Sequence, residues 1–204
     1  MFVSDTYRLI YFEIPRTGSR SISKALAVLD PSSTTAIQRQ QDKAADYHRF
    51  SVPEQAINYP IIATHRNPYD RLWSFWKYRN QYGNPDIFKQ TSWPDYLAWA
   101  VDPASQPDLG EAMTDIPISE MVNTDLVTHW LRFTNLADDW MALCEESNLP
   151  PHELPHVNHS RAAGSFQSAY NQRCASAVYQ RFKADFERFG YREDSWLPPA
   201  AIAN

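Results

Sequence analysis

The residues best suited to chemistry lie in one short segment, Pro15-Arg16-Thr17-Gly18-Ser19-Arg20-Ser21-Ile22. It follows an apolar run typical of a buried strand and leads into a segment with helical apolar spacing. A strand that turns through glycine into a helix leaves backbone N–H groups pointing outward at the positive end of the helix dipole. The hydroxyls of Ser19 and Ser21 and the charges of Arg16 and Arg20 add to these donors. The segment is therefore a candidate anion site of the kind that binds phosphate.

A second candidate is the segment Arg66-Asn67-Pro68-Tyr69-Asp70-Arg71-Leu72-Trp73-Ser74. Arg66 follows an apolar strand pattern, and open α/β sheets bind ligands at the carboxyl ends of their strands. Ser74 lies about two turns into the helix predicted to follow. The planar fork of arginine suits a phosphate, and serine adds a hydroxyl donor. The structural alternative is that Arg66 and Arg71 pair with Asp70 or nearby acids, and we prefer it for Arg71, inside the helix.

The elements that must position these segments alternate between strand and helix, which predicts an α/β fold with a parallel sheet. Gly18 and its small neighbours lie between the first strand and the first helix, and Pro68 suits the first turn of the second helix. The length fits one domain over residues 1–204. The predicted strands are 7–14, 60–65 and 127–133, and the predicted helices are 21–29, 67–80, 94–101, 135–147 and 168–189.

Composition excludes several classes of protein. The chain of 204 residues is 43% hydrophobic and has two cysteines, too few for a disulfide scaffold or a four-thiolate zinc site. No apolar run is long enough to span a membrane, and no secretory signal is visible, so we expect a cytoplasmic protein. Residues 1–79 hold 11 Lys and Arg against 7 Asp and Glu, whereas residues 80–204 hold 8 against 17. An anionic ligand thus fits the N-terminal third, and the overall acidity argues against binding nucleic acid.

Together the two motifs resemble those of sulfotransferases that use 3'-phosphoadenosine 5'-phosphosulfate, in particular the carbohydrate sulfotransferase branch. That family has a Pro-Lys-Thr-Gly-(Ser/Thr) loop after its first strand and an Arg-(Asp/Asn)-Pro-x-x-Arg-x-x-Ser segment about fifty residues later. Segments 131–136, 154–160 and 185–191 also look like family landmarks. The resemblance implies a three-layer α/β fold with a mostly parallel central sheet, similar to P-loop nucleotide kinases.

The resemblance also implies a reaction and a set of roles. A sulfuryl group would pass from 3'-phosphoadenosine 5'-phosphosulfate to an acceptor hydroxyl, on a carbohydrate. Arg66 and Ser74 would hold the 3'-phosphate of the donor, and Arg161 is a further candidate for its phosphates. No metal is expected, since a sulfuryl group carries less charge than a terminal phosphoryl group. The residues that would hold the 5'-phosphosulfate end are Arg16, Thr17, Gly18, Ser19, Arg20 and Ser21.

The chain departs from the family pattern at Arg16, where lysine is usual. Arginine is always protonated, so Arg16 keeps the electrostatic role but puts a general-acid role in doubt. The acceptor hydroxyl must also lose a proton. His48, about eighteen residues before Arg66, looks like the catalytic histidine of part of this family. Glu13, at the end of the first strand, is the second candidate base, and His65 is left as a core or supporting residue.

Other interpretations compete with this one. A small-molecule kinase with a P-loop-like site is disfavoured, because Glu13 and Ser19 stand where a Walker motif has glycine and lysine. A non-catalytic nucleotide-binding module stays open because of Arg16. Residues 152–156 spell the His-Glu-x-x-His pattern of zinc proteases, but Pro155 lies within it and argues against a helix. The aromatic residues Trp73, Phe75, Trp76, Tyr78 and Tyr82 are read as core first; some of them, with Trp93, Tyr96 and Trp99, could instead line an acceptor cleft.

Overall fold

The computed structural model describes the chain except for residues 36–51, 53, 83–89, 103–115, 156–164 and 199–204. The chain divides into two compact units. The first unit contains residues 1–66 and 121–159, and the second contains residues 67–120 and 160–204. The single domain over residues 1–204 stays a prediction.

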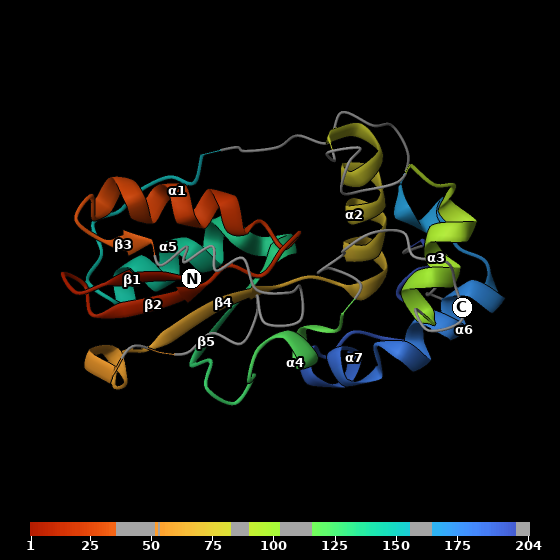
Figure 1. Cartoon of the computed structure of the whole chain (residues 1–204). Helices are drawn as coiled ribbons and strands as arrows, with labels where there is room; N and C mark the ends of the chain where they lie inside the picture. The colour runs from red at the N-terminus through yellow and green to blue at the C-terminus, as the bar shows by residue number, and fades with distance from the viewer. Residues whose placement is uncertain (36–51, 53, 83–89, 103–115, 156–164, 199–204) are drawn as a thin grey trace. The chain divides into compact units, whose positions relative to one another are not determined.

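The first unit contains a mixed sheet whose described strands lie in the order β3-β1-β2-β4-β5 (Figure 1). Strand β2 pairs in parallel with β4, and β4 pairs in parallel with β5. These are the three strands that the sequence predicts, and their parallel pairing is confirmed. The other two strands form an antiparallel edge that the sequence analysis missed. The strands are β1 (Phe2–Ser4), β2 (Leu9–Phe12), β3 (Thr34–Thr35), β4 (Ile61–His65) and β5 (His129–Arg132).

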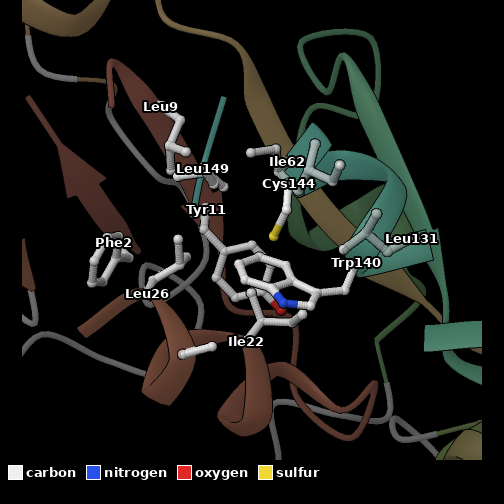
Figure 2. Packing of buried hydrophobic residues seen from close by; sticks show 12 residues of the cluster. Phe2, Leu9, Tyr11, Ile22, Leu26, Ile62, Leu131, Trp140, Cys144 and Leu149 are labelled. Atoms are coloured by element: carbon white, nitrogen blue, oxygen red, sulfur yellow. The ribbon is translucent and has the colours of Figure 1, made fainter. Parts of the chain in front are cut away.

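Two helices, α1 (Ser19–Leu29) and α5 (Leu136–Glu146), supply side chains to one core with the sheet (Figure 2). Ile22 and Leu26 are four residues apart, so both fall on the buried face of α1. Figure 2 shows Trp140 and Cys144 of α5 in the same cluster, and both side chains are buried. The strand residues in this core alternate along the chain, as one face of a sheet requires: Leu9, Tyr11, Ile62 and Leu131.

The second unit is helical in its described part. Its core joins α2 (Pro68–Tyr82), α3 (Trp93–Val101), α6 (Gln172–Arg181) and α7 (Lys183–Phe189). The prediction that the aromatic residues of this region form a core is confirmed for Phe75, Tyr96 and Trp99, which are buried. Trp73, Trp76, Tyr78 and Trp93 are only partly buried. The remaining short elements among the described residues are η1 (Glu54–Ala56), α4 (Ile118–Met121), η3 (Phe133–Asn135) and η4 (Phe166–Ala169).

The single closing helix predicted for residues 168–189 is wrong. The structure has η4, then α6 and α7. The side chain of Asn171 accepts a hydrogen bond from the backbone N–H of Cys174, and this N-cap starts α6 there. Phe182 has φ −106° and ψ 18°, outside the helical region, and it separates α6 from α7. The apolar spacing that suggested one helix continues across this bend because both helices face the same core.

No helix in the described part of the chain is long and apolar enough to cross a membrane. The cytoplasmic location stays a prediction.

Candidate functional site

The loop between β2 and α1 turns at Gly18, the N-cap residue of α1. Gly18 has φ 87°, a left-handed conformation that side chains with a Cβ rarely adopt. A Cβ at this position would also lie 2.6 Å from Cδ2 of Leu136 and 3.2 Å from Cδ2 of Phe133. The backbone conformation therefore favours glycine, and a Cβ here would also force the side chain of Leu136 to shift.

The first turn of α1 carries hydroxyls and a positive charge but no acidic residue. Ser19 and Ser21 contribute the hydroxyls, and Arg20 is exposed. No side chain caps this end of α1. The positive end of a helix dipole favours acidic side chains, so an arginine there is unfavourable unless an anion offsets it. The local charge is therefore suited to an anionic ligand.

Thr17 anchors the loop to the sheet. Its hydroxyl donates to the carbonyl oxygen of Ile14 at 2.8 Å and shares a second hydrogen bond with the hydroxyl of Thr64 on β4. Thr64 in turn shares a hydrogen bond with the hydroxyl of Tyr11, whose pKa is raised by burial. The side chain of Thr17 is fully buried. It thus fixes the position of the loop relative to β2 and β4.

Arg66, directly after β4, meets the same loop. Its Nη1 donates a 2.9 Å hydrogen bond to the carbonyl oxygen of Arg16. Its guanidinium carbon lies 3.9 Å from the centroid of the Phe133 ring. Arg66, the first residue of the second motif, therefore contacts the loop of the first motif within the first unit.

Glu13, the second candidate base, is held by two partners. Its Oε1 accepts a 2.5 Å hydrogen bond from the hydroxyl of Ser23 on α1, and its Oε2 lies 3.3 Å from the amino group of Met1. The Glu13 side chain is 25% exposed. The carboxylate is therefore tied to the side of α1 and accessible to solvent.

His65 is buried at the end of β4, edge-on to the ring of Trp130 on β5 with 6.1 Å between centroids. Burial lowers the pKa of His65 to about 4, and the opposite charges of Asp139 and Arg132 modify it to a smaller extent. His65 is therefore neutral at pH 7. The interpretation of His65 as core fits this burial.

In the second unit, Ser74 is a buried residue of α2. Its pairing with Arg66 around one phosphate stays a prediction. Arg71 is 1% exposed, and its Nη1 donates to the carbonyl oxygen of Ile116 at 3.0 Å. Burial raises the pKa of the Asp185 carboxyl, and the positive charge of Arg71 partly offsets this rise. The preference for a structural role for Arg71 is supported by these contacts.

Two predicted site residues, His48 and Arg161, lie outside the described residues. Residues 151–155 contain no helix, which argues against the zinc-protease pattern, whose second histidine also lies outside the described part. Among the described residues, no group of three or more His, Cys, Asp or Glu could hold a metal ion.

The sequence analysis placed Phe133 in the landmark segment 131–136 but gave it no role, and in the structure it contacts Arg66 from η3. A usable signal existed, because Phe133 ends the third predicted strand and the carboxyl ends of neighbouring parallel strands meet at one edge. Its role depends on a ring contact with Arg66, which no local pattern in the sequence reports.

Comparisons with known proteins place the chain in a family. A family model described as the sulfotransferase family matches residues 1–192, and so extends over both units. The chain is similar to a protein of Xenopus laevis named carbohydrate sulfotransferase 10, with 21% identity over 247 aligned positions. The alignment covers 97% of this chain and 68% of the relative. No solved structure gave a significant match.

Proposed function

The chain belongs to the sulfotransferase family, and from this premise we propose that it transfers a sulfuryl group from 3'-phosphoadenosine 5'-phosphosulfate to a hydroxyl of a carbohydrate. The observation that carries the proposal is the meeting of the glycine-capped loop with Arg66 beside the carboxyl ends of β2 and β4. The name of the Xenopus laevis relative supports a carbohydrate acceptor.

The donor set of the loop fits an anionic group. It contains the hydroxyls of Ser19 and Ser21, the exposed charge of Arg20 and the uncapped start of α1, with no acidic residue in the first turn. Such a set suits the 5'-phosphosulfate end of the donor. Because the side chain of Thr17 is hydrogen-bonded to the sheet, we assign its contribution to the backbone N–H.

We assign the 3'-phosphate of the donor to Arg66 and Ser74, with Arg161 as a further cation. When bound, the donor supplies the sulfuryl group, which the chain's residues orient and stabilise. Arg66 offers a planar fork with several N–H donors, of which Nη1 is directed at the carbonyl oxygen of Arg16. A 3'-phosphate beside Arg66 would therefore be bound next to the loop that holds the other end of the same molecule.

Arg16 stabilises the charge on the departing phosphate in this proposal. An arginine cannot give up its proton at neutral pH, so the stabilisation is electrostatic. For the base that accepts the proton of the acceptor hydroxyl we keep both candidates, His48 and Glu13. The contacts with Ser23 and with the amino group of Met1 tie the Glu13 carboxylate to the side of α1, which favours His48.

We further propose that both units belong to one sulfotransferase domain with a three-layer, P-loop kinase-like arrangement. The family match runs through both units. Residues on the second face of the sheet, among them Ile10, Phe12 and Ala63, are also buried, as a sheet covered on both faces requires.

The experiment is a transfer assay with sulfur-labelled donor over a panel of sugars, lipids and phenols. We expect label on carbohydrate hydroxyls and no requirement for Mg²⁺. Transfer to phenols alone would contradict the carbohydrate acceptor. Tight binding of adenosine 3',5'-bisphosphate without transfer to any acceptor would favour the non-catalytic module. The Arg66→Ala variant is the control for donor-dependent transfer.

A further inference from the structure

We propose that Phe133 is a positioning residue for the donor site, whose ring holds the guanidinium of Arg66 against the carbonyl oxygen of Arg16. The inference rests on the proposed function, because it concerns the arginine assigned there to the 3'-phosphate. Phe133 acts through Arg66 and needs no contact with the donor itself.

The first support is the contact between ring and guanidinium. The guanidinium carbon of Arg66 lies 3.9 Å from the ring centroid of Phe133, well inside the range of a cation–π contact. A long arginine side chain loses much rotamer freedom when it is fixed in one position. The ring therefore restricts Arg66 before any ligand arrives, which lowers the entropic cost of binding.

The second support is the unusual backbone of Arg16, which has φ 66°. Residues with a Cβ rarely adopt this left-handed conformation unless surrounding contacts stabilise it. The 2.9 Å hydrogen bond from Nη1 of Arg66 to the carbonyl oxygen of Arg16 is such a contact. The ring that holds Arg66 thus also helps hold the loop.

The third support is that Phe133 packs on the loop directly. Its Cδ2 lies 3.2 Å from the place that a Cβ of Gly18 would occupy. One aromatic ring therefore lies against both the guanidinium of Arg66 and the glycine turn before α1. It links the two segments that the sequence assigns to the two ends of one donor.

Phe133 is itself held in place by its neighbours. The carboxylate of Asp139 accepts hydrogen bonds from the backbone N–H of Arg132 at 2.7 Å and from its Nη2 at 2.6 Å. The same carboxylate accepts a 3.0 Å hydrogen bond from the side-chain amide of Asn135. Arg132 and Asn135, which flank Phe133 and Thr134, are thereby hydrogen-bonded to α5. These bonds hold η3, and with it the Phe133 ring, in place.

The test measures the affinity of the whole chain for adenosine 3',5'-bisphosphate by calorimetry. Phe133→Leu removes the π face and keeps an apolar side chain, whereas Phe133→Tyr keeps the face. We expect Phe133→Leu to weaken binding about 3- to 30-fold and Phe133→Tyr to restore it to near the wild-type value. Tyr7→Leu, an aromatic replacement before β2 in the same unit, is the matched control and should leave the affinity unchanged.

A double-mutant cycle shows whether Phe133 acts through Arg66. In the Arg66→Ala background, Phe133→Leu should have almost no further effect on bisphosphate affinity. Equal losses from Phe133→Leu with and without Arg66 would overturn the inference and leave the proposed function intact. A wild-type chain that does not bind the bisphosphate would overturn both.

A ligand-free readout completes the test. A ring 3.9 Å from the guanidinium should shift the NMR signal of the Arg66 side-chain Nε–H upfield. The shift should disappear in Phe133→Leu and persist in Phe133→Tyr. A signal at the position of a solvent-exposed arginine in the wild-type chain would overturn the inference.

Discussion

Arg16 is the residue that we assign to stabilise the leaving group of the proposed reaction. Its guanidinium carries a permanent charge, and its backbone adopts a left-handed conformation that is held from outside by Arg66. The proposed role of Arg16 in the reaction depends on its charge, whereas its backbone conformation depends on the hydrogen bond from Arg66. These two contributions can be separated by substitution.

Arg16→Lys should keep transfer activity at the wild-type level or above, because lysine retains the charge and can also release a proton. Arg16→Met removes the charge and should lower kcat by about 10²- to 10³-fold, the usual cost of one electrostatic donor in an active site. Steady-state kinetics with labelled donor measure both. Full activity in Arg16→Met would show that this charge has no part in transfer.

His65 should make the stability of the protein dependent on pH. Burial lowers its folded-state pKa to about 4 from 6.5, so the unfolded chain binds more protons between these values. The contribution of neutral His65 to the free energy of unfolding is fully present above pH 6.5. It decreases as the pH falls toward 4, by up to about 1.4 kcal/mol per pH unit.

Urea unfolding between pH 4 and 6.5 checks this prediction. His65→Leu should flatten the pH dependence, whereas His129→Gln, which removes a more exposed histidine of the same unit, should not. An unchanged slope in His65→Leu would mean that His65 titrates normally in the folded protein.

At the scale of elements, the start of α1 depends on a closely packed glycine. Two glycines in the described part of the chain share a left-handed conformation, Gly18 with φ 87° and Gly190 with φ 69°. They differ in their surroundings, because a Cβ at Gly18 would lie 2.6 Å from Leu136 and a Cβ at Gly190 would meet nothing within 4 Å. Alanine substitutions at the two glycines therefore separate the cost of the backbone conformation from the cost of close packing.

Gly190→Ala should cost about 1 kcal/mol, the price of the backbone conformation alone. Gly18→Ala should cost about 2–4 kcal/mol, since overpacking adds to that conformation. The measurement is the free energy of unfolding in urea. Equal costs at both positions would mean that the Gly18 loop relaxes and is less tightly packed than the structure indicates.

The sequence predicted the elements that carry strong local signals. The apolar runs behind β2, β4 and β5 and the alternation with helices were sufficient for the parallel strands. The antiparallel edge was missed, because β1 and β3 contain only three and two residues and depend on pairing for their identity. The break at Phe182 was missed because both helices bury their apolar residues in one core.

For the site, local patterns were enough for the loop and Arg66. They could not supply the contact between Arg66 and Phe133, which joins residues 67 positions apart. They also did not show that Thr17 binds the sheet through its hydroxyl, because that depends on the partner strand carrying Thr64.

At the scale of the whole molecule, we propose that the chain binds both ends of an adenosine nucleotide that carries 3'- and 5'-phosphate groups. The family match over residues 1–192 and the meeting of the two motifs at Arg66 support it. A kinase would instead recognise the phosphate chain of ADP with Mg²⁺ and would have no use for a 3'-phosphate site.

The most direct measurement compares the affinity for adenosine 3',5'-bisphosphate with that for ADP, with and without Mg²⁺. We predict that the bisphosphate binds at least about tenfold more tightly, without a metal requirement, and that Arg66→Ala removes about 10- to 100-fold of that affinity. Tighter binding of ADP that depends on Mg²⁺, or an Arg66→Ala variant that binds the bisphosphate as well as the wild-type chain, would contradict the account.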